Sequence, residues 1–135
     1  MIYAVLDTNV IVSGMISGNP ESPTKRCLRS ILSGRVCPLY NDKIIAEYRE
    51  VLTRQKFHFG ADKIDAIINE IISDGLNTEQ IVSDESFIDV SDRVFYEVAL
   101  AKADDDAKVV TGNLRHYPIS PIVVTPAEFC TMIGI

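Results

Sequence analysis

The chain has 135 residues, of which 47% are hydrophobic and 24% charged, with 13 Lys and Arg against 19 Asp and Glu. This length favours one compact domain over residues 1–135, and the composition excludes disordered, collagen-like and coiled-coil chains. The net charge of −6, taken as a whole, argues against indiscriminate binding to nucleic acid.

The first part of the chain alternates short apolar runs with amphipathic segments. Residues 2–6 are mostly apolar, too few for a helix and rich in β-formers, which predicts a buried parallel strand. Cap residues and apolar spacing then predict helices over residues 9–16, 22–33 and 41–56, with a second strand over residues 36–40 between the last two helices.

The alternation continues in the second half. A row of isoleucines predicts a helix over residues 62–74, ended by Gly75, and Ile81 and Val82 suggest a short strand ahead of an acidic loop. The remaining expected elements are a helix over 92–103, strands over 107–111 and 122–125, and a short helix opened by Pro126. Strands that alternate with helices predict an α/β domain with a parallel sheet covered on both faces.

The cysteines and the longest apolar runs indicate the cellular compartment that we expect for the protein. Cys27, Cys37 and Cys130 are odd in number and lack zinc-site spacing, which is typical of a reduced cytoplasmic protein. No apolar run approaches the roughly 20 residues that a membrane span needs, so we expect no membrane partner.

Charge is distributed unevenly along the chain. Residues 25–56 hold eight basic and three acidic residues, whereas residues 57–135 hold five basic and fourteen acidic ones. Two interpretations stay open, namely two solvated helix faces or a polyanion-binding flank beside an acidic pocket. In the second interpretation, the substrate-binding side chains of the flank are Arg29, Arg49 and Arg54.

Three acidic residues stand where this fold class places ligands. Asp7 ends the first predicted strand, and ligands bind outside the carboxyl ends of parallel strands, although Asp7 could instead cap the next helix. Glu47 lies at the margin of an apolar helix face, and Asp92 stands at a helix start, where Asp89 is a competing cap. Converging carboxylates repel one another unless a cation offsets their charge, and oxygen ligands without Cys or His select Mg²⁺ or Mn²⁺. Such ions promote phosphodiester hydrolysis.

A late strand contributes neutral polar groups to the same edge. It ends at Thr111, and Asn113 follows after a glycine, so a hydroxyl and a carboxamide are expected near Asp7. These groups can hydrogen-bond to water or to phosphate but carry no charge.

Other polar residues are expected outside the site. Glu97 and the acidic run at residues 104–106 are expected to be solvated. His58 lies in a predicted loop, and His116, which is close to Asn113 and could touch substrate, is expected at the surface.

These residues together resemble the PIN-domain family, in particular the toxin components of toxin–antitoxin pairs. The resemblance spans essentially the whole chain. It rests on an ordered set of motifs: Leu6-Asp7-Thr8-Asn9-Val10, Glu47-Tyr48 with Val51-Leu52, Asp92-Arg93-Val94-Phe95-Tyr96 with Ala99, Val110-Thr111-Gly112-Asn113, and Pro126-Ala127-Glu128-Phe129. It implies a three-layer α/β/α sandwich around a central parallel sheet of four to five strands, and metal-dependent cleavage of RNA in single-stranded regions.

The resemblance also implies roles for individual residues. Asp7, Glu47 and Asp92 correspond to the three main acidic residues of the family's metal site, and Thr8 and Thr111 match positions that support it. Many members have Asp where this chain has Asn113, so the number of ions, one or two, stays open. RNA and an antitoxin protein are the implied partners, and the apolar helix over residues 62–74 could be shared in a homodimer.

Two alternatives compete with an active nuclease. The domain could bind RNA or an antitoxin while cleaving slowly or not at all, with Asn113 as the lesion. An aspartyl phosphotransferase or phosphatase would need an acid two residues after Asp7, where Asn9 stands, and a late lysine where Thr111 stands.

Our hypothesis from the sequence is a metal-dependent endoribonuclease. Asp7 and Asp92 bind the metal, Glu47 binds it or positions the attacking water, and Asn113 and Thr111 assist. Because the overall acidity disfavours polyanions, RNA binding is expected to depend on the metal.

Overall fold

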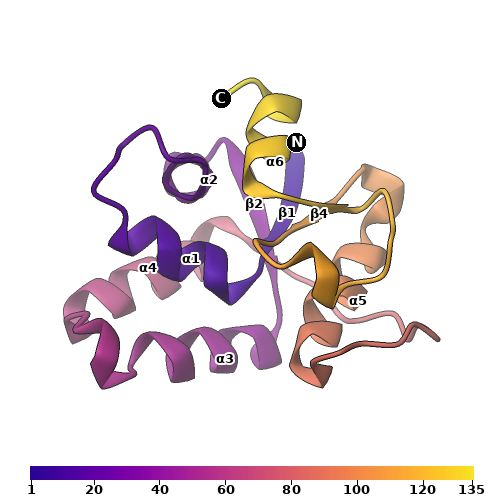
Figure 1. Ribbon diagram of the computed structural model, residues 1–135, viewed down its shortest axis with the longest axis horizontal. Coiled ribbons are helices and arrows are strands. Elements are labelled where there is room, and N and C mark those ends of the chain that lie inside the picture. The colour runs from indigo at the N-terminus through magenta and orange to yellow at the C-terminus, as the bar shows by residue number, and fades with distance from the viewer.

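A five-stranded parallel sheet forms the centre of the protein in the computed structural model, which describes residues 1–135 (Figure 1). The strands, in chain order, are β1 (Ile2–Leu6), β2 (Val36–Tyr40), β3 (Leu76–Asn77), β4 (Lys108–Val110) and β5 (Val123–Val124). Their order across the sheet is β3-β2-β1-β4-β5, and every neighbouring pair runs parallel. The order reverses between β1 and β4, and such a reversal opens a crevice at the carboxyl ends of the two strands.

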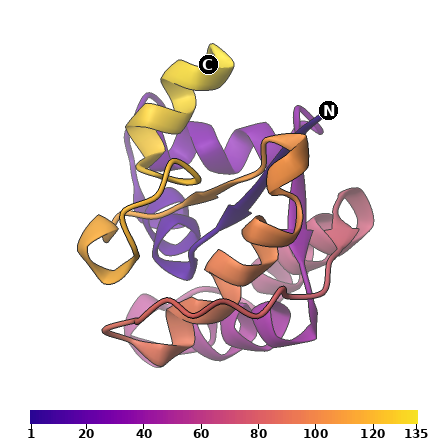
Figure 2. The same cartoon turned by 90° about the vertical axis from the view of Figure 1, so that its right-hand side faces the viewer.

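Six α-helices cover the two faces of this sheet. They are α1 (Thr8–Ile16), α2 (Pro23–Leu32), α3 (Asp42–Leu52), α4 (Ala61–Asp74), α5 (Arg93–Ala101) and α6 (Pro126–Ile133). Helices α2 and α4 contact β2 from one side, and α5 contacts β1, β2 and β4 from the other, as Figures 1 and 2 show. The expected three-layer α/β/α sandwich is therefore confirmed. None of the helices is both long enough and apolar enough to cross a membrane.

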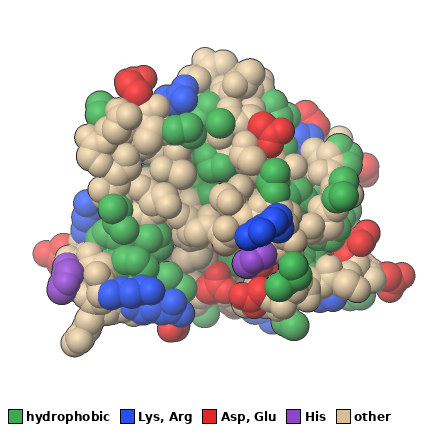
Figure 3. Space-filling view, in the orientation of Figure 1, with side chains coloured by type: hydrophobic (Ala, Val, Ile, Leu, Met, Phe, Trp, Pro, Cys, Tyr) green, Lys and Arg blue, Asp and Glu red, His purple; other side chains and the backbone are tan.

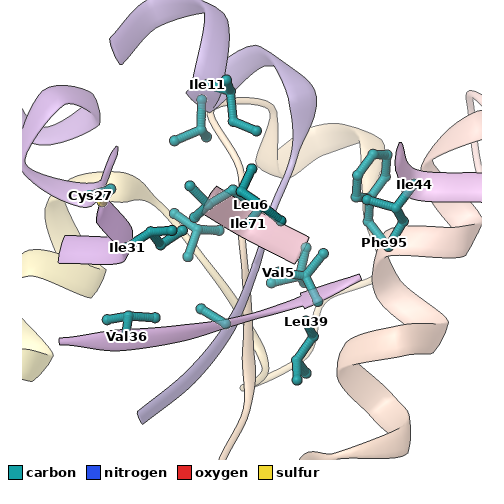
Figure 4. Packing of buried hydrophobic residues seen from close by; sticks show 14 of the residues in the cluster. Val5, Leu6, Ile11, Cys27, Ile31, Val36, Leu39, Ile44, Ile71 and Phe95 are labelled. Atoms are coloured by element: carbon teal, nitrogen blue, oxygen red, sulfur yellow. The ribbon is translucent and has the colours of Figure 1, made fainter. Parts of the chain in front are cut away.

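The central strands are buried on both faces, as their apolar runs predict. Figure 4 shows Val5 and Leu6 of β1 between Ile31 of α2 and Phe95 of α5. Burying one such side chain contributes about 1.5–3 kcal/mol, so the strand ends are held by a rigid core. Polar residues that follow β1 and β4 directly are positioned by this core.

Several helix ends follow local signals in the sequence. The side chain of Ser22 accepts a hydrogen bond from the backbone of Lys25 at the start of α2, and Asn41 caps α3 in the same way. Thr125 and Glu128 form a reciprocal capping box at the start of α6. These caps satisfy amides that the first helical turn leaves without partners.

Helix α3 is shorter than the expected helix over residues 41–56. It ends at Leu52 because the Thr53 hydroxyl donates to the Arg49 carbonyl and Arg54 takes an extended backbone. A short 3-10 helix, Gln55–Phe57, follows. The polar residues after Leu52 therefore leave the helix axis and are free to line a surface.

The strand suggested at Ile81 and Val82 is wrong. These side chains are 49% and 88% exposed, and the edge strand β3 comes earlier, at Leu76–Asn77. Gly75 explains the early pairing, because a Cβ atom there would lie 2.4 Å from the Pro38 carbonyl oxygen of β2. Only glycine lets the two backbones approach so closely at this point.

The remaining elements are shorter than expected at their ends. Helix α5 begins after a 3-10 helix at Val90–Asp92 and ends at Ala101, and β4 and β5 occupy only the centres of their expected ranges. The run at residues 104–106 overlaps a 3-10 helix at Ala103–Asp105 and is exposed, in keeping with its acidity.

Candidate active site

A cleft of about 530 Å³ opens at the carboxyl ends of β1 and β4. The four residues predicted to be catalytic, which are Asp7, Glu47, Asp92 and Asn113, all line it. They come from four separate places: the end of β1, the middle of α3, the residue before α5 and the loop after β4. The structure thus brings together residues that span more than one hundred positions.

Asp7 is the most buried of the four, with 4% of its surface exposed. It occupies the N-cap position of α1, yet its side chain makes no capping hydrogen bond. Its Oδ2 atom instead accepts hydrogen bonds from the hydroxyls of Thr111 and Tyr117, each 2.9 Å away. Burial raises the pKa of Asp7, and the two hydroxyls offset only part of this effect.

Glu47 is tied to the opposite side of the cleft. The hydroxyl of Thr8 donates to Oε2 of Glu47 over 2.5 Å, which links the first turn of α1 to α3. Burial raises the pKa of Glu47, the Thr8 hydrogen bond opposes the rise, and the negative charges of Asp7 and Asp89 add to it. Thr8 therefore has a structural partner in addition to its predicted supporting role.

Asp92 lies 8% exposed immediately before α5. Burial and the charges of Asp7, Asp89 and Glu47 raise its pKa to about 7. Asp89 caps the preceding 3-10 helix by accepting from the Ser91 amide, which leaves Asp92 free of that task. A carboxyl group with such a pKa is protonated about half of the time at neutral pH unless a cation binds.

The negative charge of the cleft is not balanced by the protein itself. No Lys or Arg side chain forms an ion pair with Asp7, Glu47 or Asp92. Arg54 also lines the cleft but pairs with Glu50, and the basic group nearest to these three carboxylates is His116, whose Nδ1 atom lies 3.6 Å from an oxygen of Asp92. Figure 3 shows acidic side chains gathered between groups of basic and histidine side chains on this face.

The donor set suits a hard divalent cation. Its charged members are all carboxylates, and oxygen ligands are those that Mg²⁺ and Mn²⁺ prefer. No three His, Cys, Asp or Glu side chains are placed to hold one ion together, however. The carboxylates therefore line one cleft without forming a ready-made set of ligands for one ion.

The loop after β4 is fixed by its polar groups. The amide of Asn113 donates to the Thr111 hydroxyl, and the amide of Gly112 donates to Oδ1 of Asn9 over 3.2 Å. Thr111 is fully buried and joins this loop to Asp7. The backbone at Asn113 is thereby fixed, and its exposed side chain lines the cleft.

The three arginines predicted to bind substrate lie in different places. Arg54 lines the cleft and pairs with Glu50, whereas Arg49 pairs with Asp65 of α4 on the exposed surface. Arg29 lines a separate hollow together with Arg26 and Arg35. The structure therefore brings only Arg54 to the acidic residues, and a substrate role for any of the three stays a prediction.

Of two further polar residues in the site region, one was not anticipated. Tyr117 was missed because it follows an irregular loop, although a buried tyrosine needs a partner for its hydroxyl, and that need was the available signal. His116 lines the cleft, with a side chain that is still partly exposed.

The expectation that Glu97 is solvated is wrong. Glu97 is 3% exposed and accepts hydrogen bonds from Gln80, Ser83 and Arg93. These bonds favour its charged form and hold its pKa below the usual value despite burial. The sequence hid this arrangement because residues 80–83 form an irregular segment that covers α5.

Comparison with known proteins gives one match. The sequence model of a family described as PIN domain matches residues 3–115, which include β1 except its first residue, β2 to β4, and the four residues predicted to be catalytic. No curated protein and no solved structure matches the chain. Tyr117 lies outside the matched range.

Proposed function

Because the chain belongs to the PIN-domain family, whose members are generally nucleases, we propose that it is a metal-dependent endoribonuclease that hydrolyses phosphodiester bonds in RNA. The observation that carries the proposal is the group of Asp7, Glu47 and Asp92 in one cleft, with raised pKa values and no Lys or Arg partner. A structural role alone does not explain three such carboxylates, since burying charges without partners is costly.

Asp7 and Asp92 would hold Mg²⁺ or Mn²⁺, and Glu47 would hold it or orient the attacking water. When bound, the ion supplies Lewis-acid polarisation of the phosphodiester and activation of water. Thr111 and Tyr117 fix the orientation of the Asp7 carboxylate and favour its ionised form. Thr8 does the same for Glu47. The Asn113 amide is available to hydrogen-bond to water or phosphate.

A nuclease assay tests this proposal. Wild-type protein and Asp7→Asn are incubated with unstructured and structured RNA in Mg²⁺, in Mn²⁺ and in EDTA. We expect cleavage by the wild type that requires the ion and favours unpaired RNA, and a loss of at least about 100-fold in Asp7→Asn. Asp65→Asn, which removes an exposed carboxylate paired with Arg49, serves as the matched control and should cleave normally.

Other outcomes of the same assay separate the alternatives. Equal cleavage by the wild type and Asp7→Asn would point to a contaminating nuclease and overturn the proposal. RNA binding without cleavage under every condition would favour a binding domain, for which the neutral Asn113 is the motivating observation.

The biological setting that we propose is the toxin of a toxin–antitoxin pair in the cytoplasm. Its support is the resemblance of the motifs, and three free cysteines are in keeping with a reduced compartment. This proposal would be supported by a neighbouring gene that encodes a small DNA-binding protein, if that protein copurifies with this chain and blocks cleavage.

We also propose that the chain forms a homodimer, as the resemblance implies. Sedimentation of the purified chain tests this, and a monomer at micromolar concentration would contradict it.

A further inference from the structure

A short segment rich in basic and aromatic residues forms one wall of the acidic cleft. This segment, residues 54–59, reads Arg54-Gln55-Lys56-Phe57-His58-Phe59 and follows α3 directly. Arg54 and Phe57 line the cleft, while Arg54 and Phe59 line a second hollow of about 500 Å³. The segment therefore separates two hollows that share one arginine.

The two phenylalanine rings of this segment are stacked. Their centroids lie 5.6 Å apart and their planes differ by 17°. His58 between them has a φ of 56°, a left-handed conformation that is uncommon for residues other than glycine. Phe59 packs against the hydrophobic core, so it supports Phe57, which is only partly buried and borders the cleft.

Positive charge lies beside these rings. The ammonium group of Lys56 lies 5.1 Å from the centre of the Phe57 ring, and Lys56 forms no ion pair. Arg54 is held by Glu50 at the exposed edge of the same cleft. A partly exposed aromatic ring with flanking cations is the combination that binds the unpaired bases and phosphates of single-stranded nucleic acid.

We propose that Phe57 is a stacking platform for one unpaired base of an RNA strand whose backbone enters the acidic cleft. Lys56 and Arg54 then contact the phosphates on either side of that base. The base replaces the Lys56 ammonium on the ring, since an exposed cation–π contact is weaker than base stacking. This proposal rests on the proposed function, because it takes RNA as the substrate.

The size of the apolar surface favours a base over a protein partner. Only Val12, Val51 and Phe57 are hydrophobic among the fifteen residues that line the cleft. A partner helix buries a row of several apolar side chains in a continuous hydrophobic groove, and this cleft offers no such row. A single planar base, in contrast, needs one ring on which to stack.

Equilibrium binding tests the platform without depending on cleavage. Fluorescence anisotropy is measured on the wild-type protein with an unpaired RNA oligonucleotide and with Ca²⁺ in place of Mg²⁺ or Mn²⁺, so that a divalent ion is available to the oxygen ligands of the cleft, and a denaturing gel checks that the RNA stays intact. Phe57→Leu, which keeps apolar bulk but removes the ring, should weaken binding roughly 5- to 150-fold. Phe57→Tyr, which keeps the ring, should bind nearly as the parent does.

Abasic substitutions in the RNA provide the matched control. Removing the stacked base alone should weaken binding to the parent protein as much as Phe57→Leu does. The same abasic strand should no longer distinguish Phe57→Leu from the parent protein. Equal affinity of Phe57→Leu for intact RNA, or a loss that persists with every abasic strand, would overturn the proposal.

A fluorescent base reports on the unsubstituted ring, so the test does not require any Phe57 variant to fold. The fluorescent base 2-aminopurine is placed at each position of the RNA strand in turn. Stacking on Phe57 predicts that its fluorescence is quenched at one position, and the absence of quenching at every position contradicts the proposal. If quenching is seen but wild-type protein never cleaves, the proposed function fails and the platform stands. If wild-type protein cleaves without localised quenching, only the platform fails.

Discussion

Tyr117 donates a hydrogen bond from its phenol to Oδ2 of Asp7 over 2.9 Å, although the two residues are 110 positions apart in the sequence. The same oxygen accepts from Thr111. Two hydroxyls on one carboxylate oxygen hold the group in a single orientation and leave the other oxygen free of side-chain donors. The loop after β4 thus determines how the residue that directly follows β1 faces the cleft.

Tyr117→Phe should therefore destabilise the protein by about 1–3 kcal/mol at pH 8, because a buried carboxylate loses one of its two side-chain donors. Urea denaturation in EDTA measures this change. Tyr40→Phe is the matched control, since its hydroxyl makes only a long bond of 3.4 Å to a carbonyl near the surface. An equal loss in both variants would mean that the Asp7 bond has no special weight.

The stability of the metal-free protein should fall as pH rises. Because the folded-state pKa of Asp92 is about 7 and its ordinary value is 3.8, folding favours the protonated acid. This contribution is complete below about pH 4 and is lost as pH rises through about 7. The free energy of unfolding should thus drop by about 2–3 kcal/mol between pH 5 and pH 8 in EDTA.

Two variants and the addition of Mn²⁺ check this pH dependence. Asp92→Asn should flatten most of the slope, whereas Asp65→Asn should keep it, as Asp65 lies in an exposed ion pair. Mn²⁺ at pH 8 should restore stability to the wild type, since a cation that binds the ionised carboxylates favours the folded state. If the free energy of unfolding of Asp92→Asn depends on pH as steeply as that of the wild type, the pH dependence comes from other groups.

Asn113→Asp should strengthen binding of a divalent ion. It adds a further carboxylate to a cleft that Asp7, Glu47 and Asp92 already line, together with Glu50 and Asp89. We expect roughly tenfold tighter Mn²⁺ binding by calorimetry, and a metal-free protein that is about 1 kcal/mol less stable at pH 8, because like charges repel. Asn77→Asp, on the exposed edge strand, should change neither quantity, and unchanged affinity in Asn113→Asp would exclude position 113 from the ion site.

Arg54→Gln should reduce the salt dependence of RNA binding. Each lost phosphate contact lowers the slope of log K against log salt concentration by about 1. Arg29→Gln should leave the slope unchanged, because Arg29 lies in a different hollow. If both variants lower the slope equally, RNA covers a wider surface than the cleft, as the charge of residues 25–56 suggests.

Local signals account for the elements that sequence predicted well. The apolar run of β1 and the caps Ser22 and Asn41 depend on neighbours a few positions away, so their effects are visible in the sequence. The exposed pair at Ile81 and Val82 shows the limit, because an apolar pair alone does not say whether a strand is available to pair with it.

In the candidate site, too, residues marked by local signals were predicted, and residues placed by the folded chain were not. Ligands bind at the carboxyl ends of parallel strands, which pointed to Asp7, and the position of Glu47 at the margin of an apolar helix face pointed to that residue. Both line the cleft in the structure. Tyr117 escaped notice because the loop after β4 has neither periodicity nor caps that fix its path. Glu97 was misjudged because its hydrogen-bonding partners come from an irregular segment that shows no pattern in the sequence.

The strand order has a consequence for the timing of synthesis. β1 is made first, yet one of its two neighbours, β4, pairs Ala4 with Lys108 and so emerges from the ribosome long afterwards. A nascent chain that stops short of Thr111 has neither hydroxyl that orients Asp7. An enzyme of the kind proposed here is synthesised from a messenger RNA close at hand, and the strand order delays assembly of its cleft until late in translation.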